Sequence, residues 1–353
     1  MSLLTEQVKN NIKSFLPKFQ EWLKSDEAKQ FIEERNNKEK ETIRLLDEAN
    51  IGKLTELDFR QLIASLWAYT GFTNKDYVAD RILKSTDFST IKSELKNLLY
   101  GDKPLSIRYD EFFEKVKGIG PAGVTEILAF VKKDQYGIWN DKSRKALKML
   151  GLEEKLPVEK YKISGSEYEL VNDVLKSISK IIKPEEEYDL IFVDFFLYYI
   201  VTYIPEKEVA IEIEDYSFDH DEIVDMLVEI GNGLGFEAES EKLIAKGARV
   251  DVVWQAKIAN LGILNYVFEV HRAGSIDSLI LNLQRAKNNP TVQKLVIVAN
   301  KKNINKIKEE VESLSEDFRK SLVFFEAKDV EKIAELWREL SSILSKLELV
   351  KSF

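Results

Sequence analysis

The chain of 353 residues contains no cysteine, and it is poor in proline and histidine, with seven and two residues respectively. The absence of cysteine excludes disulfides as a source of stability. The fold must therefore rest on an apolar core, for which the 44% of hydrophobic residues provides the material. The length allows two or three domains. Abundant lysine, glutamate and isoleucine without cysteine indicate a thermophilic source.

Long hydrophobic runs are missing as well. The strongest run, Leu190–Ile204, is shorter than the roughly 20 residues that a membrane-spanning helix needs, and Asp194 interrupts it. It predicts a buried helix that packs two domains together or forms a dimer surface. Residues Met1 to Leu16 place apolar residues at helical spacing and lack the pattern of a secretory signal. We expect a soluble, cytoplasmic protein without a membrane partner.

The net charge of −9 hides an uneven distribution. Between Glu185 and Glu229 the chain has 15 acidic residues and one basic residue, whereas 12 basic residues lie between Lys242 and Lys308 and outnumber the acidic ones. A locally basic segment can attract nucleic acid even in a protein that is acidic as a whole.

This basic segment contains two short apolar runs that read as strands, Val250–Trp254 and Tyr266–Val270. Each carries one carboxylate, Asp251 or Glu269. A carboxylate within a valine-rich strand is costly unless something neutralises it, so a pair on adjacent strands indicates a divalent cation. Two unrelated carboxylates at a sheet edge are the alternative.

The elements around these strands follow a definite order. An acidic helix and a glycine turn come first, then the Asp strand, the Glu269-Val270-His271 strand, a helix over Ser275–Lys287 that carries Gln284, and a strand over Leu295–Ala299. This succession resembles the core of the restriction-endonuclease-like (PD-(D/E)XK) superfamily. The resemblance implies a central mixed sheet, Mg²⁺ or Mn²⁺ held by Asp251 and Glu269, and a catalytic role for Gln284. His271 stands where the family has lysine, and imidazole can accept a proton from water but lacks a fixed charge.

The same resemblance extends to the helix over His220–Gly233, which matches the family's first core helix. That helix usually supplies a further glutamate to the metal site, and Glu222 and Glu229 lie seven residues apart on one helix face. Glu229 is preferred and Glu222 remains the alternative. Nucleic-acid contacts are expected from the basic residues of the region, namely Arg249, Arg272, Arg285 and Lys287.

The first 100 residues show helical periodicity, and a glycine-rich turn follows at Val116–Thr125. Two helices joined by Gly118-Ile119-Gly120, with Gly123 in the second, read as a helix-hairpin-helix. Its amide groups would hold a nucleic-acid phosphate without reading the bases. Packing alone can also explain such glycines.

Residues 55–151 resemble the helix-hairpin-helix fold of DNA glycosylases. Asn140 stands where that family keeps a catalytic aspartate, and Pro121-Ala122 stands where its bifunctional members keep a lysine. An amide cannot stabilise a developing positive charge, and the Pro121-Ala122 position offers no lysine amine to form a Schiff base. The resemblance therefore implies a binding domain and not a glycosylase.

Together these patterns predict an α plus α/β protein of three segments. Residues 1–155 form an all-α helix-hairpin-helix domain, 156–206 a helical connector, and 207–353 a restriction-endonuclease-like α/β domain that starts with an edge strand at 209–214. The predicted function is a metal-dependent endonuclease that hydrolyses phosphodiesters, with DNA favoured over RNA and a homodimer expected. The alternative is an inactive nuclease fold that serves as a binding or scaffold factor on DNA, ribosomal or transcription complexes.

Overall fold

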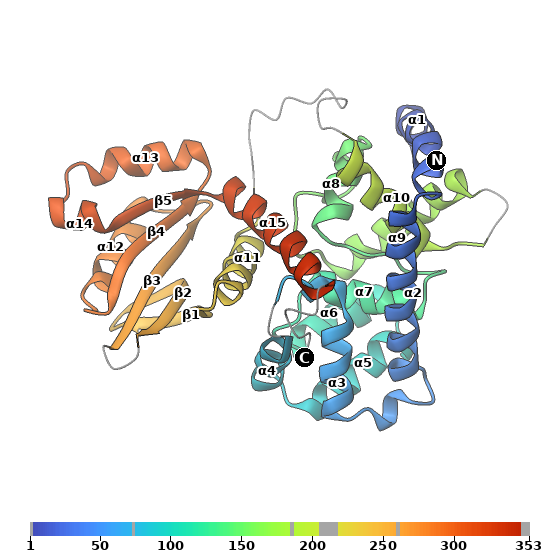
Figure 1. Cartoon of the computed structure of the whole chain (residues 1–353), viewed down its shortest axis with the longest axis horizontal. Coiled ribbons are helices and arrows are strands. Elements are labelled where there is room, and N and C mark those ends of the chain that lie inside the picture. The colour runs from blue at the N-terminus through green and yellow to red at the C-terminus, as the bar shows by residue number, and fades with distance from the viewer. Residues whose placement is uncertain (1–2, 73–74, 184–186, 205–217, 259–261, 347–353) are drawn as a thin grey trace. The chain divides into compact units, whose positions relative to one another are not determined.

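The structure is a computed structural model of the whole chain, and it describes all residues except 1–2, 73–74, 184–186, 205–217, 259–261 and 347–353. The chain divides into two compact units (Figure 1). The helical unit comprises Met1–Tyr69 and Lys75–Glu212. The sheet unit comprises Thr70–Asn74 and Ile213–Ser352.

The helical unit is built from α-helices and two short 3₁₀ turns. Many helices start at a residue whose side chain accepts a hydrogen bond from the first turn, as Thr5, Ser25, Asp87 and Ser164 do. The helices are α1 (Glu6–Trp22), α2 (Asp26–Leu46), α3 (Glu56–Ser65), α4 (Lys75–Ser85), α5 (Phe88–Tyr100), α6 (Leu105–Lys115), α7 (Pro121–Val131), α8 (Asp141–Met149), α9 (Gly165–Ile182) and α10 (Leu190–Tyr203), and the 3₁₀ turns are η1 (Ile51–Lys53) and η2 (Trp67–Tyr69).

The apolar run that begins at Leu190 forms α10, which is buried within the helical unit. Phe196 of α10 packs edge-on against Phe19 of α1, with ring centroids 5.2 Å apart. The charge in the run is neutralised, because the Asp194 carboxylate accepts a hydrogen bond from the buried guanidinium of Arg35. In the part of the chain that the structure covers, no helix combines the length and apolar character needed to cross a membrane.

A second buried carboxylate lies on α7, the most completely buried helix of this unit. Glu126 accepts hydrogen bonds from the amide groups of Trp67 and Ala68, at 2.8 and 2.9 Å. Burial raises the pKa of Glu126, while Arg35 and these amides act in the opposite direction. Asp194 and Glu126 thus both have fixed partners.

The sheet unit contains a mixed five-stranded sheet in the order β1-β2-β3-β4-β5. The first three strands are antiparallel, and β4 and β5 continue parallel to β3. The elements are α11 (His220–Gly233), β1 (Glu237–Ala245), β2 (Ala248–Ile258), β3 (Gly262–His271), α12 (Ile276–Lys287), β4 (Val292–Ala299), α13 (Lys301–Val311), α14 (Glu316–Ser321), β5 (Leu322–Glu326) and α15 (Ala327–Lys346).

The register of β2 and β3 decides which side chains share a face of the sheet. Val253 lies opposite Val267, and both pack in a core with Leu279 and Leu283 of α12. Since side chains two apart on a strand share a face, Asp251 and Glu269 belong to this α12 face. Trp254 points to the other face, where its indole donates a hydrogen bond to the carbonyl of Leu227 on α11.

The predicted coarse class, a helical N-terminal region followed by a C-terminal α/β region with a mixed sheet, is confirmed. The predicted strands at Val250–Trp254, Tyr266–Val270 and Leu295–Ala299 lie within β2, β3 and β4. No strand was predicted at Glu237–Ala245, where β1 forms the edge of the sheet. The edge strand predicted at 209–214 lies outside the described residues.

Candidate functional site

Asp251 and Glu269 lie at the same end of β2 and β3. The backbone pairing of these strands runs to Val252 opposite Phe268, and one further step places Asp251 opposite Glu269. The amide of Val270 donates a hydrogen bond of 2.7 Å to Oδ2 of Asp251. The antiparallel hairpin therefore brings the two predicted carboxylates together, because directly opposite residues share a face at close range.

Each carboxylate is held through one of its two oxygens. Oδ2 of Asp251 accepts the hydrogen bond of the Val270 amide. Oε1 of Glu269 accepts a 2.5 Å hydrogen bond from Nδ2 of Asn282 on α12. The same Asn282 nitrogen also donates to the carbonyl of Arg249, at 2.7 Å. Among the described residues, Oδ1 of Asp251 and Oε2 of Glu269 receive no hydrogen bond, so these oxygens remain available to a ligand.

Glu269 is the electrostatically costly member of the pair. Burial is the main reason that its pKa is raised to about 8, and the neighbouring Asp251 carboxylate adds to the effect. The Asn282 amide acts in the opposite direction but does not cancel it. A strongly perturbed acid with an identifiable charge partner is typical of functional sites.

His220, the first residue of α11, is a further member of the site, and the sequence pattern did not reveal it. Its Nε2 lies 3.3 Å from Oδ2 of Asp251, and its Nδ1 lies 3.1 Å from Oδ1 of Asp221. The hydrogen bond to Asp251 is the main reason that the pKa of His220 is raised to about 9. The chain has only two histidines, and one of them lies at this site. This rarity was the signal by which the sequence could have pointed to His220.

The other histidine is the predicted catalytic residue, His271 at the end of β3. It is only 9% exposed, and burial lowers its pKa. It therefore carries no charge near neutral pH and cannot replace the fixed charge of a lysine. Within the described residues, the imidazole that contacts a site carboxylate is that of His220.

A third carboxylate, Glu241, belongs to the neighbouring strand β1. It falls between the pairs Ser240 with Val252 and Lys242 with Val250, and so lies across from Asp251. Glu241 is exposed and has a φ of 53°, which is unusual for a residue other than glycine. Its charge adds to the rise in the pKa of Glu269.

The other predicted acids and Gln284 have different surroundings. The carboxylate of Glu229 is bound by the guanidinium of Arg338 on α15 through hydrogen bonds of 2.6–3.2 Å. Glu222 is buried in the first turn of α11, where its amide donates to the Asp219 cap. On α12, the residue that reaches Glu269 is Asn282, two positions before Gln284.

Of the four basic residues predicted to contact nucleic acid, the three arginines are exposed and the lysine forms an ion pair. Arg249 and Arg272 are exposed. Arg285 is also exposed and donates to the carbonyl of Gly247, at 3.3 Å. Lys287 is paired with Asp317.

The predicted hairpin turn lies between α6 and α7. Gly118 has a φ of 86°, a conformation that glycine adopts without strain. Gly120 precedes α7, whose first turn has no side-chain cap. Gly120 and Gly123 both lie close to tyrosine hydroxyls, those of Tyr161 and Tyr69, where a β-carbon would collide. These two glycines therefore have a packing role as well.

Asn140 caps α8. Its side-chain oxygen accepts a 2.8 Å hydrogen bond from the amide of Ser143, whose hydroxyl in turn accepts one from the amide of Asn140. Asp141, the adjacent acid, forms ion pairs with Arg144 and Lys145. The side chains at the position predicted to match the glycosylase aspartate thus stabilise the start of this helix.

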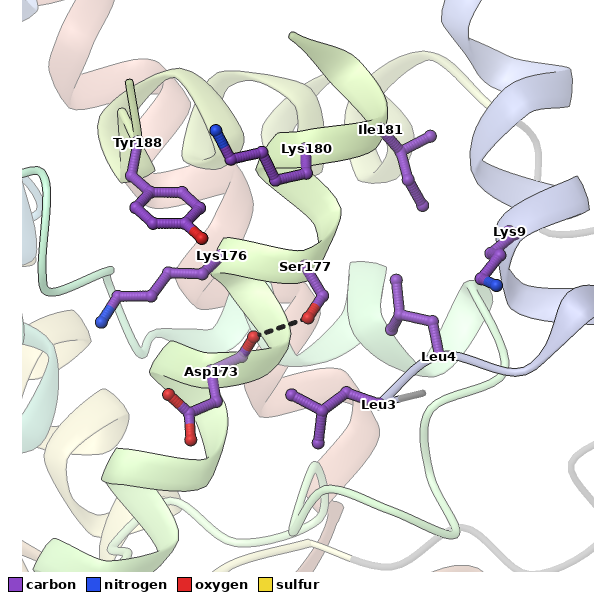
Figure 2. Close-up of a pocket in the computed structure, with 9 residues that line it drawn as sticks. All are labelled: Leu3, Leu4, Lys9, Asp173, Lys176, Ser177, Lys180, Ile181 and Tyr188. Atoms are coloured by element: carbon purple, nitrogen blue, oxygen red, sulfur yellow. Dashed lines mark hydrogen bonds between the residues drawn. The ribbon is translucent and has the colours of Figure 1, made fainter. Parts of the chain in front are cut away.

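A cavity of about 430 Å³ lies elsewhere in the helical unit, between α9 and the start of the chain (Figure 2). Its walls combine apolar side chains such as Leu4 and Ile181 with Lys176 and Lys180. Figure 2 shows one hydrogen bond among the lining residues, from the hydroxyl of Ser177 to the carbonyl of Asp173 on the same helix. Nζ of Lys180 lies 4.7 Å from the centroid of the Tyr188 ring, which also lines the cavity.

The chemistry of the carboxylate pair fits a hard divalent cation. Mg²⁺ keeps several water ligands and is commonly bound through one or two carboxylates together with substrate phosphates. Oδ1 of Asp251 and Oε2 of Glu269 match that need. Within the described residues, no ready-made group of three or more histidine, aspartate or glutamate side chains could hold a metal ion.

The chain matches no protein-family model, no curated protein and no solved structure.

Proposed function

We propose that the sheet unit is a metal-dependent nuclease of the restriction-endonuclease-like kind, which hydrolyses phosphodiester bonds in DNA. The main support is the convergence of Asp251 and Glu269, each anchored through one oxygen and open at the other. The succession α11, β1, β2, β3, α12 and β4, with the carboxylates on β2 and β3, agrees with the order that the sequence resemblance implies.

In this proposal Asp251 and Glu269 hold Mg²⁺ or Mn²⁺, which when bound activates water and offsets the charge of the scissile phosphate. Asn282 keeps the Glu269 carboxylate in place through its 2.5 Å hydrogen bond. The Val270 amide does the same for Asp251. Such supporting contacts fix the orientation of ligands before the substrate arrives.

The helical unit is proposed to bind the DNA backbone through the turn between α6 and α7. The uncapped first turn of α7 offers amide groups to a phosphate, and the exposed side chain of Lys117 belongs to the same turn. Contacts of this kind position the nucleic acid without reading its sequence.

The experiment is a cleavage assay of the full chain with supercoiled, single-stranded and branched DNA in Mg²⁺ or Mn²⁺. Cleavage is expected, and the double variant Asp251→Asn/Glu269→Gln should reduce it to the background. The matched control is Asp277→Asn/Glu309→Gln, which neutralises two exposed acids of the same unit and should remain active. Cleavage that persists in the first variant would place the activity outside this site.

A second candidate function is a DNA-binding or scaffold protein that has lost its chemistry. The burial of His271, which leaves an uncharged ring where the family has lysine, favours it. In that case the chain binds DNA in gel-shift experiments, but neither metal ion produces cleavage.

A further inference from the structure

We propose that α15 is the docking surface for a second copy of this chain, and that the two α15 helices pair antiparallel through an exposed apolar stripe. The inference does not depend on the proposed nuclease function. It assigns an interface to the homodimer expected from the sequence, on a helix that the sequence patterns did not single out.

The stripe lies on one side of α15. It consists of four large apolar side chains that are 40–54% exposed, namely Ile333, Leu336, Leu340 and Ile343. At 3.6 residues per turn they fall within an arc of about 80°. Single exposed apolar side chains are ordinary on a protein surface, whereas a contiguous row of them is typical of an interaction site.

The neighbouring side of α15 is the one that holds the helix in the sheet unit. Ala334 is fully buried, and the guanidinium of Arg338 binds the carboxylate of Glu229 on α11. The Trp337 indole lies so close to Gly233 of α11 that a β-carbon there would collide with it. The stripe is therefore a second apolar side of the helix, which these contacts do not use.

The spacing of the stripe favours another helix as its partner. Its four residues follow one another at intervals of three, four and three, as the a and d positions of a heptad do. Such a row packs best against a helix with the same row, because each side chain enters the space between four residues of the other helix. A second copy presents this same row, so the interface can be isologous, with two-fold symmetry.

The sequence that follows α15 supports the same partner. It repeats the a and d spacing at Leu347 and Val350. A pair of chains that uses all six positions has six apolar layers, whereas the stripe within α15 alone supplies four.

Charges beside the stripe favour the antiparallel arrangement. Glu339 is exposed, and the sequence has Lys346 one heptad later, at the same flank position. In an antiparallel pair in which Leu340 faces Ile343 of the other copy, position 339 also faces position 346, and opposite charges meet twice across the two-fold axis. A parallel pair would place Leu344 opposite Glu339 instead.

The test is analytical ultracentrifugation of the full chain, which should sediment with twice the mass of one chain. Leu336→Glu/Leu340→Glu should weaken this association by at least about 100-fold, because it places charges in an apolar seam. The matched control, Leu57→Glu/Leu243→Glu, changes two leucines that are 65% and 64% exposed on other elements and should associate like the wild type.

A second variant guards against a loss of folding. Leu336→Ala/Leu340→Ala keeps the helix-forming propensity of α15 and should also weaken the association. Circular dichroism verifies that each variant retains its helices.

A charge exchange tests the orientation of the two helices. Glu339→Lys brings lysines together across the axis and should weaken the association by roughly tenfold. Glu339→Lys/Lys346→Glu should restore it. Failure of this restoration would overturn the antiparallel arrangement.

A wild-type chain that remains monomeric at concentrations on the order of 100 μM would overturn the inference. A dimer that persists in Leu336→Glu/Leu340→Glu would also overturn it, and would place the interface outside α15.

Discussion

Two buried acids of the helical unit and Glu269 of the sheet unit have opposite surroundings. Asp194 in the helical unit faces the Arg35 guanidinium, and Glu126 receives two backbone amides. Glu269 in the sheet unit faces another carboxylate, that of Asp251, and has Asn282 as its hydrogen-bond donor. Acids with fixed, complementary partners stabilise a fold, whereas an acid kept next to a like charge is typical of a functional site.

The largest effect on stability is expected from removing one member of a buried ion pair. Asp194→Ala leaves Arg35 buried without its partner and should lower the free energy of unfolding of the helical unit by about 3–5 kcal/mol. Urea unfolding followed by hydrogen exchange measures this loss unit by unit. Glu269→Gln is the counterpart in the sheet unit and should be neutral or stabilising in the absence of metal. Equal losses in the two variants would remove the contrast between the units.

Because Glu269 lies next to a like charge, it should also make the stability of the sheet unit depend on pH. The pKa of Glu269 is about 8 in the folded state and 4.5 in its ordinary range, so its contribution is fully present below pH 4.5 and is lost as the pH rises through 8. His220, with a pKa of about 9, adds a loss of the same sign between pH 6.5 and 9. Without metal, the free energy of unfolding of the sheet unit should fall from pH 5 to pH 9, most of all in the wild type.

Hydrogen exchange of sheet-unit peptides across this range is the measurement. Glu269→Gln should remove the decline below pH 6.5, lessen it between pH 6.5 and 8, and keep the part that His220 contributes. A variant with the same slope as the wild type from pH 5 to pH 6.5 would show that Glu269 ionises normally in the folded protein.

Much of the sheet unit could be predicted from sequence because its central strands are buried and apolar. Valine-rich runs predicted β2 and β3, and each carboxylate was recognisable as the charged residue within its apolar run. The edge strand β1 gave no such signal, since among its residues only Ala238 is buried and the others are largely charged or polar. A strand that gains its stability from pairing on one side lacks the hydrophobic pattern on which such predictions depend.

The predicted site was incomplete for a related reason. Asp251 and Glu269 follow from strand periodicity, which is local. His220 and Asn282 reach the site from helices, and their contacts depend on how α11 and α12 pack on the sheet. Gln284 and Asn282 lie two positions apart on α12, about 200° around the helix, so a small error in register selects the wrong side chain.

The role of Asn282 gives a prediction of intermediate size. Asn282→Ala removes the hydrogen bond that orients Glu269 and should weaken metal binding by about 10- to 100-fold. Gln284→Ala, a matched change on the same helix, should have a much smaller effect. Calorimetric titration with Mn²⁺ measures both. A greater loss in the Gln284 variant would return this role to the residue that the sequence resemblance suggested.

The smallest effect on stability is expected at Asn140. Its variants test whether a hydrogen-bonded side chain only stabilises its helix, even at a position that resembles a catalytic one. Asn140→Ala removes the cap of α8 and should lower the free energy of unfolding of the helical unit by about 1 kcal/mol. Asn140→Asp keeps an acceptor for the Ser143 amide and should restore most of that loss. Urea unfolding followed by hydrogen exchange distinguishes the two variants. Because the Asn140 side chain is committed to its own helix, we expect neither variant to gain base-excision activity on damaged DNA, and such a gain in Asn140→Asp would show that the position retains a catalytic geometry.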